Sequence, residues 1–176
     1  MTAQHATSVQ APPAGCYRID PQRSQVSYTG RHMFGMGVVH ATFAIRSGQF
    51  EVADPLTGSS VVVTVEAGSF RSSSAKRDKD VRSASLLDLA AHPDITFRSE
   101  ALRRDGDTWR VSGIVTAHGK SVPVEVVVDQ VMPETGGVRV HGRADRLDRY
   151  AFGVTNGKGM VGRYLDLDLG VFAVSA

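Results

Sequence analysis

Apolar and polar residues alternate along most of this chain, which is the pattern of β-strands that bury one face. In four segments nearly every second residue is apolar and the residues between are mostly polar: 39–46, 122–129, 138–145 and 165–171. Because successive side chains of a strand point to opposite faces, each segment predicts one apolar and one polar face. Turn signals such as Asp105-Gly106 separate several of these segments.

The number and spacing of these segments predict an all-β domain. Counting the shorter alternating segments near the N-terminus, the chain has about eight strands, many of them joined by short turns. This arrangement is typical of an antiparallel barrel or sandwich, and no repeat of about 30 to 50 residues favours a propeller or solenoid instead. We expect one domain over residues 17–176, preceded by a flexible tail over residues 1–16.

One stretch, over residues 72–99, interrupts the alternation. It carries a dense run of charges followed by apolar residues at helical spacing, so it predicts a short helical crossover over about residues 75–91. Ser85 and Asp88 form a Ser-x-x-acid pair that favours a helix start, and Pro93 favours a helix end just before it.

Composition and charge exclude several classes of function. Apolar residues make up 41% of the chain and charged residues 22%, as in ordinary soluble domains. Twenty basic against eighteen acidic residues leave a net charge of +2, which is too small to predict nucleic-acid binding. Cys16 is the only cysteine, so no disulfide can form within the chain.

The N-terminal residues bear on localisation. Residues 1–15 lack the basic start and apolar core of a secretory signal peptide. Pro13-Ala14-Gly15-Cys16 resembles a bacterial lipoprotein cleavage site, but no hydrophobic segment precedes it. No segment approaches the roughly 20 apolar residues of a membrane-spanning helix. We therefore expect a cytoplasmic protein that does not span a membrane.

The apolar faces mix large residues, such as Phe97 and Trp109, with small ones, such as Gly113, Ala117 and Gly142. An eight-stranded barrel is just wide enough to be filled by its own side chains or to hold one small ligand. Small residues that face inward would leave room for a ligand, whereas close packing of small against large residues would give a dry core. The sequence leaves both possibilities open.

The chain also carries an ordered set of short motifs. They are Tyr17-Arg18-Ile19-Asp20-Pro21, His32-Met33, Arg77-Asp78, Val81-Arg82-Ser83, Leu86-Leu87, His92-Pro93-Asp94-Ile95-Thr96-Phe97-Arg98-Ser99, His118-Gly119 and Asp148-Arg149. Together they resemble the signature of the YceI-like polyisoprenoid-binding family. The resemblance implies an eight-stranded antiparallel lipocalin-like β-barrel that binds a polyisoprenoid or similar lipid, often as a homodimer. Tyr17 stands where tryptophan is common in that family, and His40 where glycine is frequent.

The resemblance and the alternation together predict which residues line the cavity. We expect the lipid to contact inward-facing apolar side chains and a histidine near the mouth. The predicted residues are Tyr28, His32, Met33, Phe34, Phe43, Phe97, Trp109, Val115, Val126, Tyr150, Phe152 and Leu167. A register error of one residue would turn the side chains of a whole strand to the other face.

The charged residues of two family motifs have two interpretations. Arg77, Asp78 and Arg82 lie on the crossover, and Asp148 and Arg149 follow a strand. They form either a rim that contacts the polar head of a lipid or a network of ion pairs that holds the crossover on the barrel. We favour the structural interpretation.

Motifs of common enzyme classes are missing from the sequence. No two of the six histidines have the His-x-x-x-His spacing of a zinc protease, and no Gly-x-Ser-x-Gly elbow is present. Residues 153–162 depart from a phosphate-binding loop and precede a strand. We therefore predict no metal, no cofactor and no catalytic residue, although barrel strands can assemble metal ligands from distant positions.

These observations favour a non-enzymatic protein that carries or sequesters a polyisoprenoid or other amphipathic lipid. Two alternatives remain open. One is an enzyme that acts on an isoprenoid or quinone-like lipid, and the other is a stress-related structural module with a filled barrel.

Overall fold

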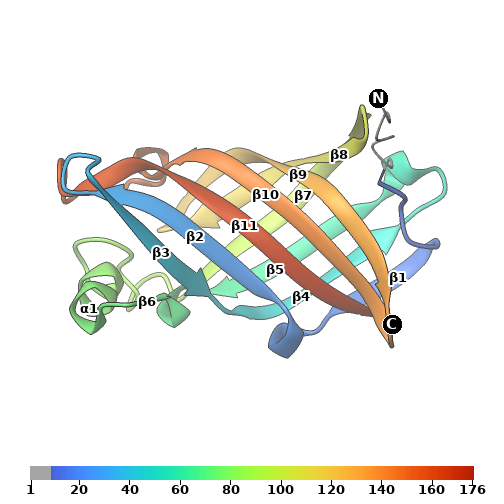
Figure 1. Cartoon of the computed structure of the whole chain (residues 1–176), viewed down its shortest axis with the longest axis horizontal. Coiled ribbons are helices and arrows are strands. Elements are labelled where there is room, and N and C mark those ends of the chain that lie inside the picture. The colour runs from blue at the N-terminus through green and yellow to red at the C-terminus, as the bar shows by residue number, and fades with distance from the viewer. Residues whose placement is uncertain (1–8) are drawn as a thin grey trace, which may run out of the picture.

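A computed structural model describes residues 9–176, and their strands form one antiparallel sheet that closes on itself (Figure 1). The strands are β1 (Gly15–Ile19), β2 (Gln25–His32), β3 (Gly37–Phe43), β4 (Ile45–Val52), β5 (Ser60–Glu66), β6 (Arg71–Ser72), β7 (Asp94–Asp105), β8 (Thr108–Ala117), β9 (Lys120–Glu134), β10 (Gly137–Asp148) and β11 (Val161–Ser175). The helices are α1 (Ala75–Arg82) and the short 3-10 helices η1 (Pro21–Arg23), η2 (Leu56–Gly58), η3 (Ala67–Ser69) and η4 (Arg149–Phe152). None of the described helices is long and apolar enough to cross a membrane.

The closed barrel follows the strand order β1-β4-β5-β7-β8-β9-β10-β11, and β11 then pairs with β1. β11 also pairs with β2, so β1 and β2 lie one after the other along the same long neighbour. The turn between them begins at Asp20, whose carboxylate accepts a hydrogen bond from Gln22 N and caps η1. β3 continues into β4 through a single residue, Ala44. Eight strand positions therefore surround the interior, which confirms the predicted eight-stranded antiparallel β-barrel.

The alternation seen in the sequence corresponds to the inner and outer faces of the barrel. Val124, Val126 and Val128 of β9 point inward, whereas Glu125 forms ion pairs outside with Arg103 and Arg110. A β-bulge between β9 and β10 then shifts the register by one residue.

The predicted crossover is helical over a shorter range than expected. α1 covers Ala75–Arg82, and its N-cap is Ser74, whose hydroxyl accepts a hydrogen bond from Arg77 N. The helix ends because Ser83 bonds back to Asp80 through both its backbone N–H and its hydroxyl. Asp88, expected inside the helix, has φ of 50°, which is incompatible with right-handed helix. Residues 83–91 therefore form turns, and the helix start predicted at Ser85 was wrong.

Ser24, which lies between β1 and β2, is hydrogen-bonded to Phe172 of β11. Its buried hydroxyl accepts a hydrogen bond from Phe172 N (2.9 Å) and donates one to Phe172 O (3.2 Å). Phe172 is 1% exposed and lies under the guanidinium of Arg23. The Ser24 hydroxyl thus bonds to the backbone of Phe172 at the point on β11 where neither β1 nor β2 pairs with it.

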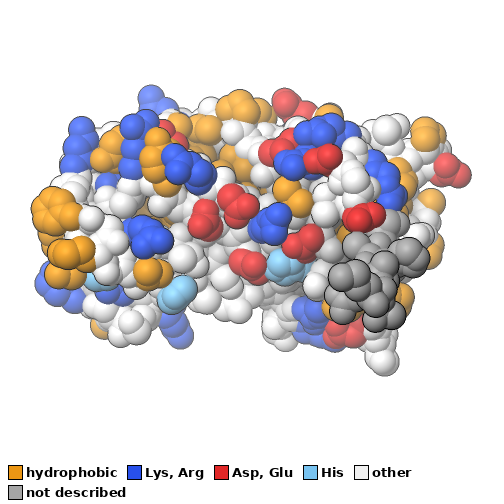
Figure 2. Space-filling view, turned by 45° about the horizontal axis from the view of Figure 1, so that its top comes forward, with side chains coloured by type: hydrophobic (Ala, Val, Ile, Leu, Met, Phe, Trp, Pro, Cys, Tyr) orange, Lys and Arg blue, Asp and Glu red, His pale blue; other side chains and the backbone are white. Residues whose placement is uncertain are grey.

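The outer face of the barrel carries acidic and basic side chains beside one another (Figure 2). One cluster spans three adjacent strands: His141 Nδ1 bonds to Asp129 Oδ1 of β9, and His141 Nε2 lies 2.8 Å from Asp168 Oδ1 of β11. Burial tends to lower the pKa of His141, but the hydrogen bonds to the two carboxylates outweigh it and hold that pKa above the ordinary value.

Replacing Ser24 with alanine should lower the free energy of unfolding by about 1–3 kcal/mol, because the buried Phe172 N–H loses its partner. Urea unfolding followed by circular dichroism measures this change. The matched control is Ser27→Ala on the adjoining strand β2, since the Ser27 hydroxyl makes no hydrogen bond within residues 9–176. Equal stability of the two variants would contradict the structural role of Ser24.

His141 should make stability depend on pH. A histidine whose pKa is raised by folding contributes stability that is fully present below its unfolded pKa of about 6.5 and is lost as the pH rises through the higher folded pKa. The difference in unfolding free energy between wild type and His141→Gln should therefore shrink as the pH is raised from acidic to alkaline. Urea titrations at several pH values measure it, with His40→Gln as control. A difference in unfolding free energy that does not change with pH would contradict the raised pKa of His141.

Candidate functional site: an apolar cavity in the barrel

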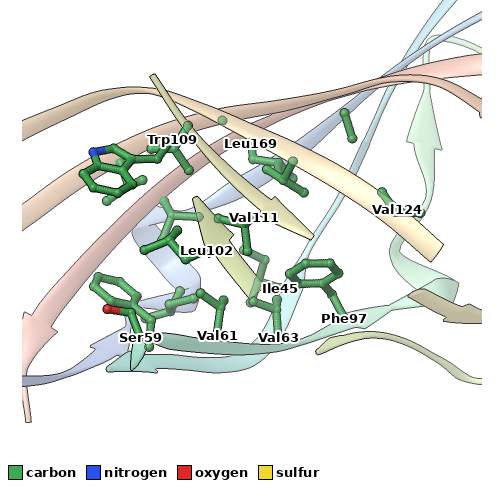
Figure 3. Close-up of a pocket in the computed structure, with 18 of the residues that line it drawn as sticks. Ile45, Ser59, Val61, Val63, Phe97, Leu102, Trp109, Val111, Val124 and Leu169 are labelled. Carbon is green, nitrogen blue, oxygen red and sulfur yellow. The ribbon is translucent and has the colours of Figure 1, made fainter. Parts of the chain in front are cut away.

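The barrel encloses a cavity of about 260 Å³ that is lined almost entirely by aliphatic side chains (Figure 3). Its walls come from alternate residues of the strands around it. They include Val61, Val63 and Val65 of β5, Ile95, Phe97 and Leu102 of β7, Trp109, Val111 and Val115 of β8, Val124, Val126, Val128 and Val131 of β9, Val140, Gly142 and Ala144 of β10, and Leu167, Leu169 and Val171 of β11. The volume lies just below the range of about 300–1,000 Å³ that is usual for ligand pockets.

The cavity remains open because its walls are built from short, branched residues. A valine at each inward position of β5 and β9 reaches less far across the barrel than a leucine or phenylalanine would. Gly142 and Ala144 take up even less space on β10, and a Cβ on Gly142 would lie 3.2 Å from Val126 Cγ1. An eight-stranded barrel with such walls is left with space that its own side chains do not fill.

The N-terminal segment forms part of one end of the cavity. Val9 N donates a hydrogen bond to Asp107 O (2.9 Å), and the indole N–H of Trp109 donates one to Val9 O (3.1 Å). Val9 is buried, and Ala11 and Pro12 line the cavity beside it. Residues 9–14, which belong to the tail expected from the sequence, thus contact the barrel, whereas residues 1–8 lie outside the described structure.

The few polar side chains in the lining are Glu51, Ser59 and Thr96. Glu51 is exposed to solvent, so this end of the cavity reaches the surface. Ser59 Oγ accepts a hydrogen bond from Ala53 N. Glu51 and Ser59 therefore lie toward the N-terminal segment, whereas Thr96 lies near the start of β7, toward the opposite end of the interior.

Aromatic residues fill the opposite end of the interior. The ring of Phe70 makes edge contacts with Tyr28 (centroids 5.7 Å apart) and Phe43 (5.3 Å), and Val81 and Leu87 of the crossover region pack against this core. Burial raises the pKa of Tyr28. Tyr28, Phe43 and Phe70 are called the aromatic plug below, because they occupy the space next to the cavity.

Five of the twelve predicted cavity residues line the cavity: Phe97, Trp109, Val115, Val126 and Leu167. The other seven do not line it. Two of these, Tyr28 and Phe43, belong to the aromatic plug. They face the interior as predicted, but they fill it.

Three more of the seven lie at the β2–β3 turn. Met33 and Phe34 have positive φ angles of 52° and 58°, which turn the chain sharply and place both side chains outside. Phe34 is 79% exposed, and its ring lies against Gly159 of the neighbouring loop. His32, at the end of β2, is half-buried and also does not reach the cavity.

The last two of the seven lie in η4, outside the barrel wall. Phe152 is buried and lines an outer groove with Pro123 and Val127. Tyr150 stacks with cationic side chains, among them Arg149 and Arg163.

The predicted charged residues contact the protein's own backbone and side chains. Asp78 is buried and accepts hydrogen bonds from Ser72 N and Ser72 Oγ, which lower the pKa of its carboxyl group. Arg77 also bonds to Ser72 Oγ, and Arg82 donates to Phe70 O. These contacts hold the crossover in place beside the aromatic plug and fix the backbone of its member Phe70.

The second charged pair holds the loop between η4 and β11. The buried guanidinium of Arg149 donates hydrogen bonds to four backbone carbonyls, those of Val154, Asn156, Val161 and Gly162. Asp148 forms a two-pronged ion pair with Arg163 and caps η4 through Tyr150 N. None of the five predicted charged residues lines the cavity.

Most of the aliphatic wall residues are lining residues that the sequence prediction missed. Val61, Val63, Val111 and Val124 all lie at apolar positions of alternating segments. Alternation alone placed them on the inward face. They were absent from the predicted cavity residues because mainly aromatic residues were selected from that face.

Known proteins resemble this chain over nearly its whole length. A model of the YceI-like domain matches residues 17–173. A UPF0312 protein of Pseudomonas putida is 33% identical over 167 residues, which cover 90% of this chain and 85% of the relative. Protein YceI of Escherichia coli O157:H7 is 29% identical over 168 residues, or 92% of this chain and 87% of the relative.

Two solved structures share the fold. Burkholderia cenocepacia BcnA superposes with a TM-score of 0.74 at 21% identity, covering 89% of this chain and 99% of BcnA. A polyisoprenoid binding domain from Saccharophagus degradans superposes with a TM-score of 0.64 at 12% identity, covering 91% and 98% of the two chains. The matched domain, the relatives and the barrel agree, and this chain belongs to the YceI-like family.

Proposed function

We propose that this protein binds and carries an amphipathic lipid, with the apolar chain of a polyisoprenoid or similar molecule in the barrel cavity. The observation that carries the proposal is the lining itself, in which aliphatic side chains surround about 260 Å³ of space. The similar fold of the domain from Saccharophagus degradans, whose name describes it as polyisoprenoid binding, supports the choice of ligand class.

The energetics of such a complex require few polar contacts. Burial of each CH₂-sized group contributes about 0.8 kcal/mol, so one five-carbon unit contributes roughly 3–4 kcal/mol before the cost of ordering the chain. The cavity is small, so it fits a short prenyl chain or one end of a longer one. The polar head then lies near Glu51 and Ser59, where the cavity reaches the surface.

The side chains that line the cavity support binding without catalysis. Glu51, Ser59 and Thr96 are its polar lining side chains, and the Ser59 hydroxyl is hydrogen-bonded to the backbone. Nothing in the described lining pairs a nucleophile with a base. A homodimer remains a prediction from the family resemblance.

Trp109 is the only tryptophan and lines the cavity, so its fluorescence can report binding. Adding farnesol to the wild-type protein should shift the Trp109 emission to shorter wavelength and give a saturable titration. In Val126→Phe the added ring occupies the cavity, and the affinity should fall at least about tenfold, or about 1.4 kcal/mol.

The matched control is Val127→Phe, because the next residue of β9 lines the outer groove rather than the cavity. Its affinity for farnesol should equal that of the wild type. No saturable titration with the wild type, or equal loss of affinity in both variants, would refute binding in this cavity. Chemical conversion of the bound farnesol, measured by mass spectrometry, would show an enzyme instead of a carrier.

The aromatic plug should set the length of the bound chain. Phe70→Ala should lower the free energy of unfolding by about 3–5 kcal/mol because a buried ring is removed. The same change extends the cavity toward α1, so the ratio of affinities for geranylgeraniol and farnesol should rise relative to the wild type. Phe34→Ala, at an exposed turn, is the control. An unchanged ratio in a folded Phe70→Ala protein would contradict this role.

A further inference from the structure

Three potential metal ligands meet at the end of the barrel that carries α1. Asp88 and His92 lie in the turns between α1 and β7, and His118 lies in the turn between β8 and β9. Each side chain offers one ligand atom, these atoms all lie within 4.8 Å of one another, and each residue is half-buried. None of the three residues lines the lipid cavity.

Backbone contacts bring the three side chains together. His92 N donates a hydrogen bond to Asp88 O (2.9 Å), so these two residues lie on one turn of chain. The rings of His92 and His118 have centroids 5.1 Å apart. Gly119 permits this approach, because a Cβ at that position would lie 2.9 Å from His92 Cε1.

The hydrogen bond of His118 leaves one ring nitrogen free to bind a metal. Its Nδ1 lies 3.1 Å from the carbonyl oxygen of Phe152, which can only accept, so Nδ1 carries the proton. The Nε2 lone pair is then available. Metal-binding histidines usually donate their second N–H to a carbonyl or carboxylate in this way, which fixes the tautomer and the ring orientation.

The other two side chains have no competing partner within residues 9–176. Neither the Asp88 carboxylate nor the His92 ring makes a side-chain hydrogen bond or an ion pair there. His141 provides the contrast, because both of its ring nitrogens are bonded to carboxylates and it has no nitrogen left for a metal.

We propose that Asp88, His92 and His118 bind a divalent transition-metal ion, with Zn²⁺ as the best-matched ion. Two imidazole nitrogens and one carboxylate suit Zn²⁺ and its first-row neighbours, whereas Ca²⁺ and Mg²⁺ prefer oxygen ligands throughout. Atoms bound to one Zn²⁺ at about 2.0–2.2 Å lie about 3–3.5 Å apart in a tetrahedron. Rotation of these half-buried side chains closes the remaining distance, and a fourth position is left for water.

The bound ion would connect turns that lie far apart in the sequence. It would link the turns after α1 to the β8–β9 turn, and through the Phe152 carbonyl to η4. The ion would therefore stabilise the closed end of the barrel, at a site separate from the proposed lipid cavity.

The test uses the full chain without a histidine tag, treated with chelator and dialysed. Isothermal titration with ZnCl₂ should give one ion per chain, and Co²⁺ should give the visible absorption bands of a tetrahedral N/O site. Zn²⁺ should also raise the melting temperature, because it binds the folded state. His92→Gln, His118→Gln and Asp88→Asn should each weaken Zn²⁺ binding by at least about tenfold and remove the thermal shift.

Two controls separate this site from other zinc ligands. His40→Gln removes an exposed histidine elsewhere on the barrel, and His5→Gln removes the histidine nearest the N-terminal amine; both should bind Zn²⁺ as the wild type does. Circular dichroism establishes that each variant is folded, and any one folded ligand variant suffices for the test. A wild-type Kd weaker than about 100 µM, or folded ligand variants that bind Zn²⁺ with wild-type affinity, would overturn the proposal.

Discussion

Closure of the sheet is the constraint on which the rest of this structure depends. Once β11 pairs with β1, eight strand positions close the ring and their number fixes the width of the interior, although the outer edge of β3 pairs over just two residues, with β6. The inward residues can then only decide how that fixed space is divided between side chains and cavity. Valine along β5 and β9 leaves space in one half, and Phe43 and Phe70 fill the other half.

The two halves of the barrel therefore have different physical roles. The plugged half carries the crossover, where the buried Asp78 is bonded to Ser72 and the half-buried Arg82 is bonded to Phe70. The open half has its own side-chain hydrogen bonds, such as that from Val61 N to Ser99 Oγ, but its aliphatic walls lack the groups that would hold a polar molecule. One half of the barrel is thus filled by side chains, and the other keeps unfilled apolar space.

Sequence reasoning predicted the barrel because alternation is a local property that each strand displays by itself. It also assigned the inward faces of β8, β9 and β11, where Trp109, Val126 and Leu167 line the cavity. It could not predict the position of a residue along the barrel axis, which decides whether an inward side chain lies in the plug or the cavity. Phe70 was not predicted as an interior residue, because it lies between η3 and β6 and belongs to no alternating segment.

Spacing along the sequence also could not predict which distant residues lie close together in the folded chain. Asp88 and His118 are thirty positions apart and both have positive φ angles, which sequence alone did not indicate. In the same way, Met33 belongs to a family motif, yet a sharp turn places it and Phe34 on the surface. The motif identified the fold, but the turn geometry decided which way those side chains point.

The hydrogen bonds of Val9 have a kinetic consequence for a molecule that enters through the end beside it. Val9 is bonded to both Asp107 and Trp109, and Ala11 and Pro12 form part of the wall there. Detaching the segment breaks two hydrogen bonds at a net cost of about 0.5–1.5 kcal/mol each, which slows passage by roughly fivefold to 150-fold if detachment must come first. Residence time inside the barrel would then depend on the N-terminal segment as well as on how well the walls fit their occupant.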